Sequence, residues 1–535
     1  MSVKIWLLPA SGAPIRFYDC ALGVIKFTVK SQQMEINKGQ QPGKQLEGIM
    51  REIRFTDTTF RDGHASLWAQ GMRTGMMLAL ARDMDKAGFA AAEVIANSNF
   101  KKCVRELRED PWERIRLLAK SLTHTPLAAM AGAGAPAPFG IAPLALQKLY
   151  LERLTANGIR RLNVMESSNN MTGRLVSTVP IAKNLGLQVV VALVFSLSPK
   201  HTDDYYAQKA KEAVALGADK VYLKDSGGLL TPERVNTVVP AILQNLNGTP
   251  LEFHTHCTTG LGPVSTLAAV LAGVDTVHTA VPPLANGASQ PSVFNVAGNL
   301  RALGFTPLVD EVPLERVSND LMRMAREDGF PVGHPLEYDY GQYVHQVPGG
   351  VISNLRHQLR QMNIEHRLPE VLEESVRVRQ DLGYPIMVTP FSQFVVSQAT
   401  INVLSGERYK LVTDEVIKYA LGVYGDEASS GVTPETREII LDRPRAGDLT
   451  KTEQAEPSLK EIRDSFGGGI TDEELLLRYA VGGEADVDAM KESGPFRDYS
   501  QHHGRPIVGL VETVLKSRDL RHVSIQQPGL SLIVE

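Results

Sequence analysis

A repeating alternation of short strand-like runs and longer helical segments is the feature that most constrains how this chain can fold. From Arg51 onward, β-prone runs are followed by segments rich in Ala, Leu and Glu with helical periodicity. The eight runs cover residues 52–56, 92–96, 127–130, 162–166, 189–194, 220–224, 251–256 and 275–278. Alternating strands and helices predict a parallel sheet, and eight such units predict an α/β fold whose sheet closes into a (β/α)8 TIM barrel.

Length and composition limit the number of domains, the partners and the location that are expected for this protein. The 535 residues exceed a single typical core, so we expect more than one domain. An apolar content of 43%, a charged content of 22% and a net charge of −4 predict a soluble globular protein that does not bind nucleic acid. Three cysteines without a Cys-x-x-Cys pair indicate a reducing, cytoplasmic location. Because no apolar run reaches about 18 residues, no membrane span is expected.

Polar residues that could carry chemistry follow the predicted strands, where a barrel gathers its active-site loops. They are Arg61 and Asp62 after the first strand, Lys101 after the second, Glu166 and Asn169 at the fourth, Lys224 at the sixth, and His254 and His256 in the seventh. The two histidines are two positions apart on a strand, so their side chains share a face and can chelate one metal ion.

Each of these residues also has an ordinary structural explanation. His254 and His256 could be polar residues at a strand end, and Asp62 could interact with free amides at a helix N-terminus. Lys224 could be a solvated lysine, but a metal beside it would repel its ammonium group. If Lys224 lies near a metal, it must therefore be neutral or modified.

Several motifs resemble the carboxyltransferase domain shared by pyruvate carboxylase, the oxaloacetate decarboxylase α subunit and the transcarboxylase 5S subunit. They cover residues 57–62, 109–114, 224–232, 254–256 and 289–292 in the barrel, and 347–355 and 388–392 beyond it. The resemblance extends over roughly residues 50 to 480 and includes the helical domain that follows the barrel in that family.

The resemblance implies a metal-dependent enzyme that moves a carboxyl group between biotin and a small organic acid or carbonyl acceptor. Its metal, zinc, manganese or a similar divalent ion, would be held by Asp62, His254, His256 and a carboxylated Lys224. Carboxylation would make Lys224 an anionic oxygen ligand and remove the repulsion noted above. Lys224 and Arg61 are the catalytic candidates, and the candidate substrate contacts are Arg61, Lys101, Glu166 and Asn169.

Five positions depart from the family pattern, and at two of them Lys101 and Cys257 stand where the family has an aspartate. Ala288 replaces the threonine that shuttles a proton, Ala131 replaces the arginine that binds pyruvate, and Ala65 replaces a glutamine. An alanine methyl can neither transfer a proton nor clamp a carboxylate. We therefore expect an acceptor other than ordinary pyruvate, with His64 and Cys257 the nearest alternative proton-transfer groups in the sequence.

Four parts of the chain are expected. They are an N-terminal extension over 1–48, the barrel over 49–315, a helical domain over 316–495, and a tail over 496–535 that possesses a helix at 510–515 and a hairpin, and could dock a partner. Residues 444–456 are expected to form a flexible linker.

The resemblance also sets the expected partners. No biotin-attachment motif with its own domain is found, so biotin is expected on a separate carrier protein, with a separate biotin carboxylase and a homo-oligomeric assembly. Two alternatives stay open: a biotin-independent metal-dependent lyase or condensing enzyme of the related barrel group, because residues 61–63 resemble their signature equally well, and a non-catalytic scaffold subunit.

Overall fold

The computed structural model describes residues 3–6, 51–137, 141–450, 456–499, 523–527 and 530–534. The chain divides into two compact units, one of residues 50–500 and one that combines residues 1–49 with 501–535. Each unit is described by itself.

Eight parallel strands of the larger unit form a closed barrel, as the sequence predicted. They are β2 (Glu52–Asp57), β3 (Ala91–Ala96), β4 (Leu127–Gly132), β5 (Arg161–Met165), β6 (Gln188–Val194), β7 (Lys220–Asp225), β8 (Leu251–Thr255) and β9 (Thr276–Thr279). Consecutive strands pair in order, and β2 also pairs with β9, which closes the sheet. The short strand β10 (Thr306–Pro307) adds to β2 outside this ring.

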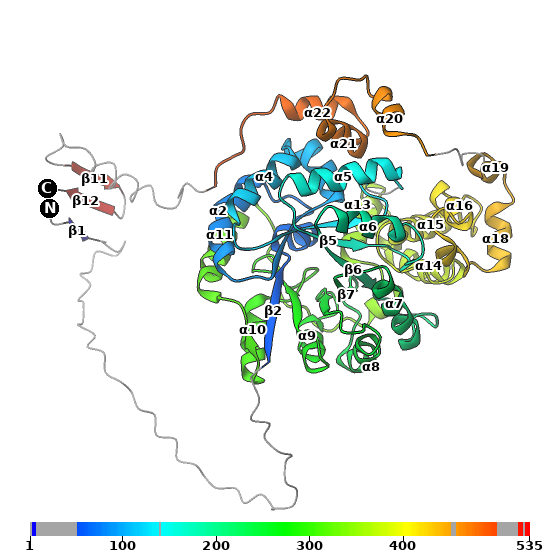
Figure 1. Ribbon diagram of the computed structural model, residues 1–535, viewed down its shortest axis with the longest axis horizontal. Helices are drawn as coiled ribbons and strands as arrows, with labels where there is room; N and C mark the ends of the chain where they lie inside the picture. Colours follow the sequence, from blue (N-terminus) through cyan, green and yellow to red (C-terminus); the bar gives the residue numbers. More distant parts are fainter. Residues whose placement is uncertain are drawn as a thin grey trace, which may run out of the picture. The chain divides into compact units, whose positions relative to one another are not determined.

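A helix follows each barrel strand and lies around the outside of the strands (Figure 1). These helices are α2 (Thr74–Lys86), α4 (Pro111–Ser121), α5 (Leu144–Ala156), α6 (Leu175–Asn184), α7 (Asp203–Ala215), α8 (Pro232–Leu243), α9 (Gly262–Leu271) and α10 (Val293–Ala302). For some of these helices, the residues at the N-terminus favour helix formation by themselves. At α8, Thr231 accepts a hydrogen bond from the Arg234 amide, and Pro232 occupies the first helical position, where no amide hydrogen is needed.

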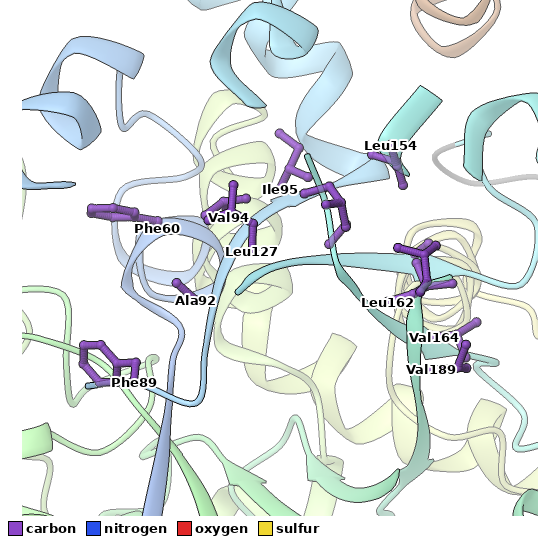
Figure 2. Close-up of a cluster of buried hydrophobic side chains, with 14 of the residues drawn as sticks. Phe60, Phe89, Ala92, Val94, Ile95, Leu127, Leu154, Leu162, Val164 and Val189 are labelled. Carbon is purple, nitrogen blue, oxygen red and sulfur yellow. The ribbon is translucent and has the colours of Figure 1, made fainter. Parts of the chain in front are cut away.

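The two faces of the barrel strands differ in chemistry. On β5, Leu162 and Val164 belong to the apolar cluster between strands and helices, part of which is drawn in Figure 2. The alternate residues Arg161 and Asn163 point the other way and hydrogen-bond to each other. Because Arg161 also bonds Glu252 on β8, which does not neighbour β5, this polar face lies inside the barrel.

The helices after the barrel fall into two groups by their packing. The first has its own apolar core and contains α13 (Gly349–Gln361), α14 (Leu368–Asp381), α15 (Phe391–Ser405), α16 (Asp414–Ala420), α17 (Asp426–Ser429), α18 (Pro434–Leu441) and α19 (Pro444–Thr450). The second contributes to the main barrel cluster and contains α11 (Glu311–Asp328), α20 (Leu459–Ser465), α21 (Asp472–Val481) and α22 (Glu484–Lys491). The short helix α12 (Gly341–His345) contacts α14, but its Tyr343 packs against the barrel cluster. The domain boundaries expected from sequence stay a prediction.

The expected linker over 444–456 is wrong in its first half. Residues Pro444–Thr450 form the helix α19, which packs beside α16. This packing buries Ala446 in the helical core. Arg445 also forms an ion pair of 2.5 Å with Asp414 of α16. Residues 451–455 lie outside the described residues.

The smaller unit contains a three-stranded antiparallel sheet. The expected C-terminal hairpin is present as β11 (Val523–Gln527) and β12 (Leu530–Val534), and β1 (Val3–Trp6) pairs with the other edge of β12. Strands from the two ends of the chain therefore share one sheet, although the sequence suggested separate parts. The helix expected at 510–515 lies outside the described residues. In the described parts of the chain, no helix has the length and apolar character needed to cross a membrane.

Candidate metal centre and substrate cavity

Three of the four expected metal ligands meet at the C-terminal end of the barrel. Asp62 lies in η1 (Thr59–Gly63), a π-helical turn that begins one residue after β2, while His254 is the penultimate residue of β8 and His256 follows that strand. One ligand atom from each lies within 4.8 Å of the other two. The Asp62 Oδ2 atom is 3.4 Å from His254 Nε2 and 3.7 Å from His256 Nε2. All three residues are buried.

Hydrogen bonds at the site orient both imidazoles. The His256 Nδ1 atom lies 2.7 Å from the carbonyl oxygen of Ala288, which can only accept, so Nδ1 donates and, in the neutral ring, Nε2 has the lone pair. The Gln290 amide nitrogen lies 3.1 Å from His256 Nε2 and 3.4 Å from His254 Nε2. Since the Gln290 oxygen accepts from Thr58, its nitrogen donates toward both rings. Nitrogen lone pairs and a carboxylate thus point to one place, which fits a divalent metal.

Lys224 completes the group at the end of β7. Its Nζ atom is 3.1 Å from His254 Nε2 and 3.3 Å from Asp62 Oδ2. Burial lowers the pKa of Lys224, and the Asp62 carboxylate opposes this only in part. Burial alone would raise the pKa of Asp62, but the charges of Arg61 and Lys224 hold it well below its usual range, so Asp62 is ionised.

A cavity of about 1380 Å³ opens above these residues. Asp62, Lys224 and His256 line its barrel side, and residues 348–351 and 388–393 of the helical region line another side. Val388 also joins the apolar cluster at the barrel mouth. The helical region therefore forms part of the cavity wall, which the motif pattern alone did not reveal.

Three of the four expected substrate contacts line this cavity. Arg61 does so while held between Asp62, at 2.9 Å, and Glu93, at 2.8 Å. Burial raises the pKa of Glu166, whose Oε2 atom accepts from the amides of Ser168 and Asn170. Lys101, on α3 (Asn97–Lys102), lines the cavity as well.

The structure does not bring Asn169 into the cavity. Its side-chain amide donates to the carbonyl of Val194 and its side-chain oxygen accepts from the amide of the same residue, at 2.9 and 2.8 Å. The side chain is buried and links the turn after β5 to the end of β6. Its polar groups are used in the fold and are not available to a substrate.

The positions that depart from the family pattern are also placed. Ala65 and Ala288 line the cavity, whereas Ala131 is buried in β4. Neither proposed replacement for the proton shuttle lines the cavity. Burial lowers the pKa of His64 to about 3, and neither ring nitrogen has a hydrogen-bond partner among the described residues. Burial also raises the pKa of the Cys257 thiol.

Comparison with known proteins identifies two family models along the chain. Residues 52–321 match the model described as HMGL-like, and residues 343–503 match the one described as conserved carboxylase domain. A pyruvate carboxylase subunit of Methanocaldococcus jannaschii is 36% identical, covering 80% of this chain and 76% of that protein. The 2-oxoglutarate carboxylase large subunit of Hydrogenobacter thermophilus is 32% identical, covering 87% and 72%.

A solved structure supports the same assignment. The carboxyltransferase domain of Rhizobium etli pyruvate carboxylase, with oxamate and biotin, superposes with a TM-score of 0.74 at 26% identity, covering 83% of this chain and 79% of that one. The carboxylase match extends over the helical region, and the relatives support the carboxyltransferase interpretation over a lyase or scaffold. The chain therefore belongs to the family of biotin-dependent carboxyltransferases that includes the carboxyltransferase domain of pyruvate carboxylase.

Proposed function

We propose that this chain is the carboxyltransferase subunit of a cytoplasmic biotin-dependent carboxylase or decarboxylase. It would move a carboxyl group between carboxybiotin and a small organic acid or carbonyl acceptor. The observation that carries the proposal is the group of Asp62, His254, His256 and Lys224, of which all but His254 line a cavity large enough for both reactants.

The proposed metal ligands are Asp62, His254, His256 and a carboxylated Lys224. Carboxylation requires an uncharged amine, and burial favours that form of Lys224. Added at Nζ, the carboxylate would place oxygen donors beside the two imidazoles. When bound, zinc, manganese or a similar ion would supply Lewis-acid stabilisation of charge on the acceptor oxygen. Arg61, fixed by Glu93, would offer a preorganised positive charge beside it.

Lys101 is the proposed receptor for the acidic group of the acceptor. The other cations at the cavity are engaged: Lys102 with Glu106, Arg105 with Asp486, Arg174 with Glu456, and Arg61 and Lys224 with Asp62. Within the described parts of the chain, Lys101 is the cavity lysine for which no ion pair is found. Glu166 would contact a hydroxyl or protonated group of the substrate.

The acceptor should be held and protonated differently from ordinary pyruvate. Ala288 offers a methyl group at the cavity where proton transfer would need a hydroxyl, and Ala131 offers no guanidinium. Two relatives carry the names of 2-oxo acid carboxylases, and one of them names 2-oxoglutarate. A larger acid whose carboxylate reaches Lys101 is consistent with these observations.

We also propose that biotin is carried by a separate carrier protein, that a separate biotin carboxylase loads it, and that the chain forms a homo-oligomer. Two relatives are named as subunits of carboxylases, which supports the proposal that separate polypeptides perform the separate steps. The proposed parts of the chain are the extension over 1–48, the barrel over 49–315, the helical domain over 316–495 and a docking tail over 496–535.

Elemental analysis tests the metal site. We expect one divalent ion per chain in the wild type and in His366→Ala, which changes an exposed histidine far along the sequence. His254→Ala and His256→Ala should each reduce the metal content strongly. A wild-type protein purified without metal chelators that contains no metal would refute the proposal.

Steady-state kinetics with a biotinylated carrier test the acceptor site. For a carboxylate acceptor, Lys101→Gln should raise KM roughly 10- to 100-fold, as expected for losing a charged hydrogen bond. Lys102→Gln is the matched control, since Lys102 already pairs with Glu106. Equal KM values for the two variants would remove Lys101 from the site. Rapid wild-type carboxylation of pyruvate, unimproved in Ala288→Thr, would contradict the altered-acceptor proposal.

A further inference from the structure

Below the metal site, a buried hydrogen-bonded chain runs from Glu252 through His278 to His254. We infer that His278, held by Glu252, is a positioning residue that fixes the tautomer and ring orientation of the metal ligand His254. This inference rests on the metal site proposed above and assigns a role to two residues outside the ligand set.

The hydrogen bonds from Glu252 through His278 to His254 have a defined donor and acceptor at each step. His278 Nε2 lies 2.9 Å from Glu252 Oε2, and His278 Nδ1 lies 3.1 Å from His254 Nδ1. The Glu252 carboxylate can only accept, so in the neutral His278 ring the proton lies on Nε2 and the lone pair on Nδ1. His254 must then donate from Nδ1, which leaves its Nε2 lone pair toward the metal site. The Gln290 amide nitrogen and the Asp62 Oδ2 atom both lie 3.4 Å from His254 Nε2, so the contact with His278 is the one that decides the tautomer.

Packing gives His278 a single orientation. The ring is 1% exposed and stacks on Tyr222, with centroids 5.6 Å apart and planes 13° apart. Glu252 is held in turn by Arg161, through its two terminal nitrogens, and by Lys220 at 2.9 Å. His278 and Glu252 are therefore each held by more than one contact, as expected for residues that orient a metal ligand.

A second chain starts from the same carboxylate and ends at another ligand. Arg161, bonded to Glu252, donates to Asn163 at 2.8 Å, and Asn163 donates to Glu93. Glu93 accepts from Arg61, which pairs with Asp62 at 2.9 Å. Glu252 thus anchors both Asp62 and His254 through the barrel interior. The shorter route, through His278 alone, gives the more direct test.

Metal affinity in the full-length protein tests the inference. We expect His278→Ala to raise the dissociation constant for Zn²⁺ or Mn²⁺ by about 10- to 100-fold, as for other residues that hydrogen-bond to a metal ligand. His278→Asn retains an acceptor near the Nδ1 position and should lie between wild type and His278→Ala. Tyr222→Phe is the control, because the Tyr222 hydroxyl has no hydrogen-bond partner among the described residues and the stacked ring is kept. The visible spectrum of the Co²⁺ form should change in His278→Ala and not in Tyr222→Phe.

A measurement on the wild type avoids dependence on variants that fold poorly. Histidine ¹⁵N spectra of the metal-free protein should show His254 protonated on Nδ1 and His278 protonated on Nε2, with the His254 signals assigned by their loss in His254→Gln. An Nε2-protonated His254, or wild-type metal affinity in His278→Ala, would overturn the inference. A wild type that binds no metal, yet shows these tautomers, would instead refute the proposed metal function.

Discussion

The barrel interior and the helical region of residues 347–446 differ in how deeply their Arg–carboxylate pairs are buried. In the barrel, Arg161 and Glu252 form an ion pair with side-chain exposures of 2% and 0%. In the helical region, Arg360 and Glu365 form a pair with exposures of 66% and 39%, and the buried Glu374 pairs with Arg408, whose side chain is 43% exposed. Both regions contain Arg–carboxylate pairs, so burial is the main difference between them.

This difference indicates what each region is built for. Burying an ion pair costs desolvation energy that apolar residues of similar size would avoid. The barrel nonetheless places Arg161, Glu252 and His278 where an ordinary barrel has layers of branched apolar side chains. We interpret this as stability given up so that ligands at the barrel mouth are held in one orientation. The helical core is mainly apolar, and although it buries Glu374 and Arg379, the ion-pair partner of Glu374, Arg408, is 43% exposed.

The largest expected effect comes from removing the shared carboxylate. Glu252→Ala leaves Arg161 and Lys220 without their common anion inside the barrel, so the free energy of unfolding should fall by about 3–5 kcal/mol. Urea unfolding measures it, with Glu315→Ala on the exposed face of α11 as the control. A loss no larger than in that control would remove the proposed contrast between the two regions.

A second prediction concerns Asp57, a buried carboxyl at the end of β2 whose Oδ2 atom has no hydrogen-bond partner among the described residues. Burial raises its pKa from 3.8 to about 7, so between these values the folded protein binds a proton that the unfolded chain releases. Stability should therefore fall as pH rises from about 4 to 7, by up to about 1.4 kcal/mol per pH unit. Asp57→Asn should remove this slope in urea unfolding followed across pH, and an unchanged slope would contradict the burial argument.

A smaller effect is expected in the helical core. Ile417, on α16, is fully buried, and Ile417→Val removes one methylene group from an apolar site. The expected loss is about 0.5–1.5 kcal/mol in thermal or urea unfolding. Metal content should match the wild type, because the change lies outside the polar chains of the barrel. If this variant loses metal, then packing in the helical core affects the metal site of the barrel, although the two regions have separate apolar cores.

The smallest effect is expected at the exposed pair. Arg360→Ala breaks the contact with Glu365, but water and salt screen that contact, and the unfolding midpoint should not change measurably. Comparing the midpoints of wild type and variant at low and high salt provides the check. A clear destabilisation that disappears at high salt would show that exposed pairs contribute more here than their solvent contact implies.

The barrel itself could be predicted from the sequence because strand runs and helical segments alternate at local, readable periods. The structure has all eight expected strands, with ends displaced by no more than a residue or two. The expected meeting of Asp62, Lys224, His254 and His256 is also seen. Their position at strand ends was sufficient, because strand ends of a closed parallel barrel share one face.

Other features depend on contacts that sequence spacing does not encode. Asn169 follows a barrel strand as Glu166 does, yet its side chain bonds the end of β6 and does not face the cavity. Gln290 belongs to a recognised motif, but its contact with both histidines follows from the path of the loop after β9. The cavity wall formed by residues 388–393 comes from helices far along the chain.

By itself the sequence determined the strand order, the family motifs and the residue types available for a metal, because these follow from local pattern and side-chain chemistry. Tertiary structure decided which nitrogen of each histidine faces the site, which cations are already paired, and that Glu252 connects to both Asp62 and His254. Those outcomes arise from pairing across a closed barrel, where Asp62 and Lys224, although 162 positions apart in the sequence, come within hydrogen-bonding distance. The sequence supplied the groups, and barrel closure set their partners.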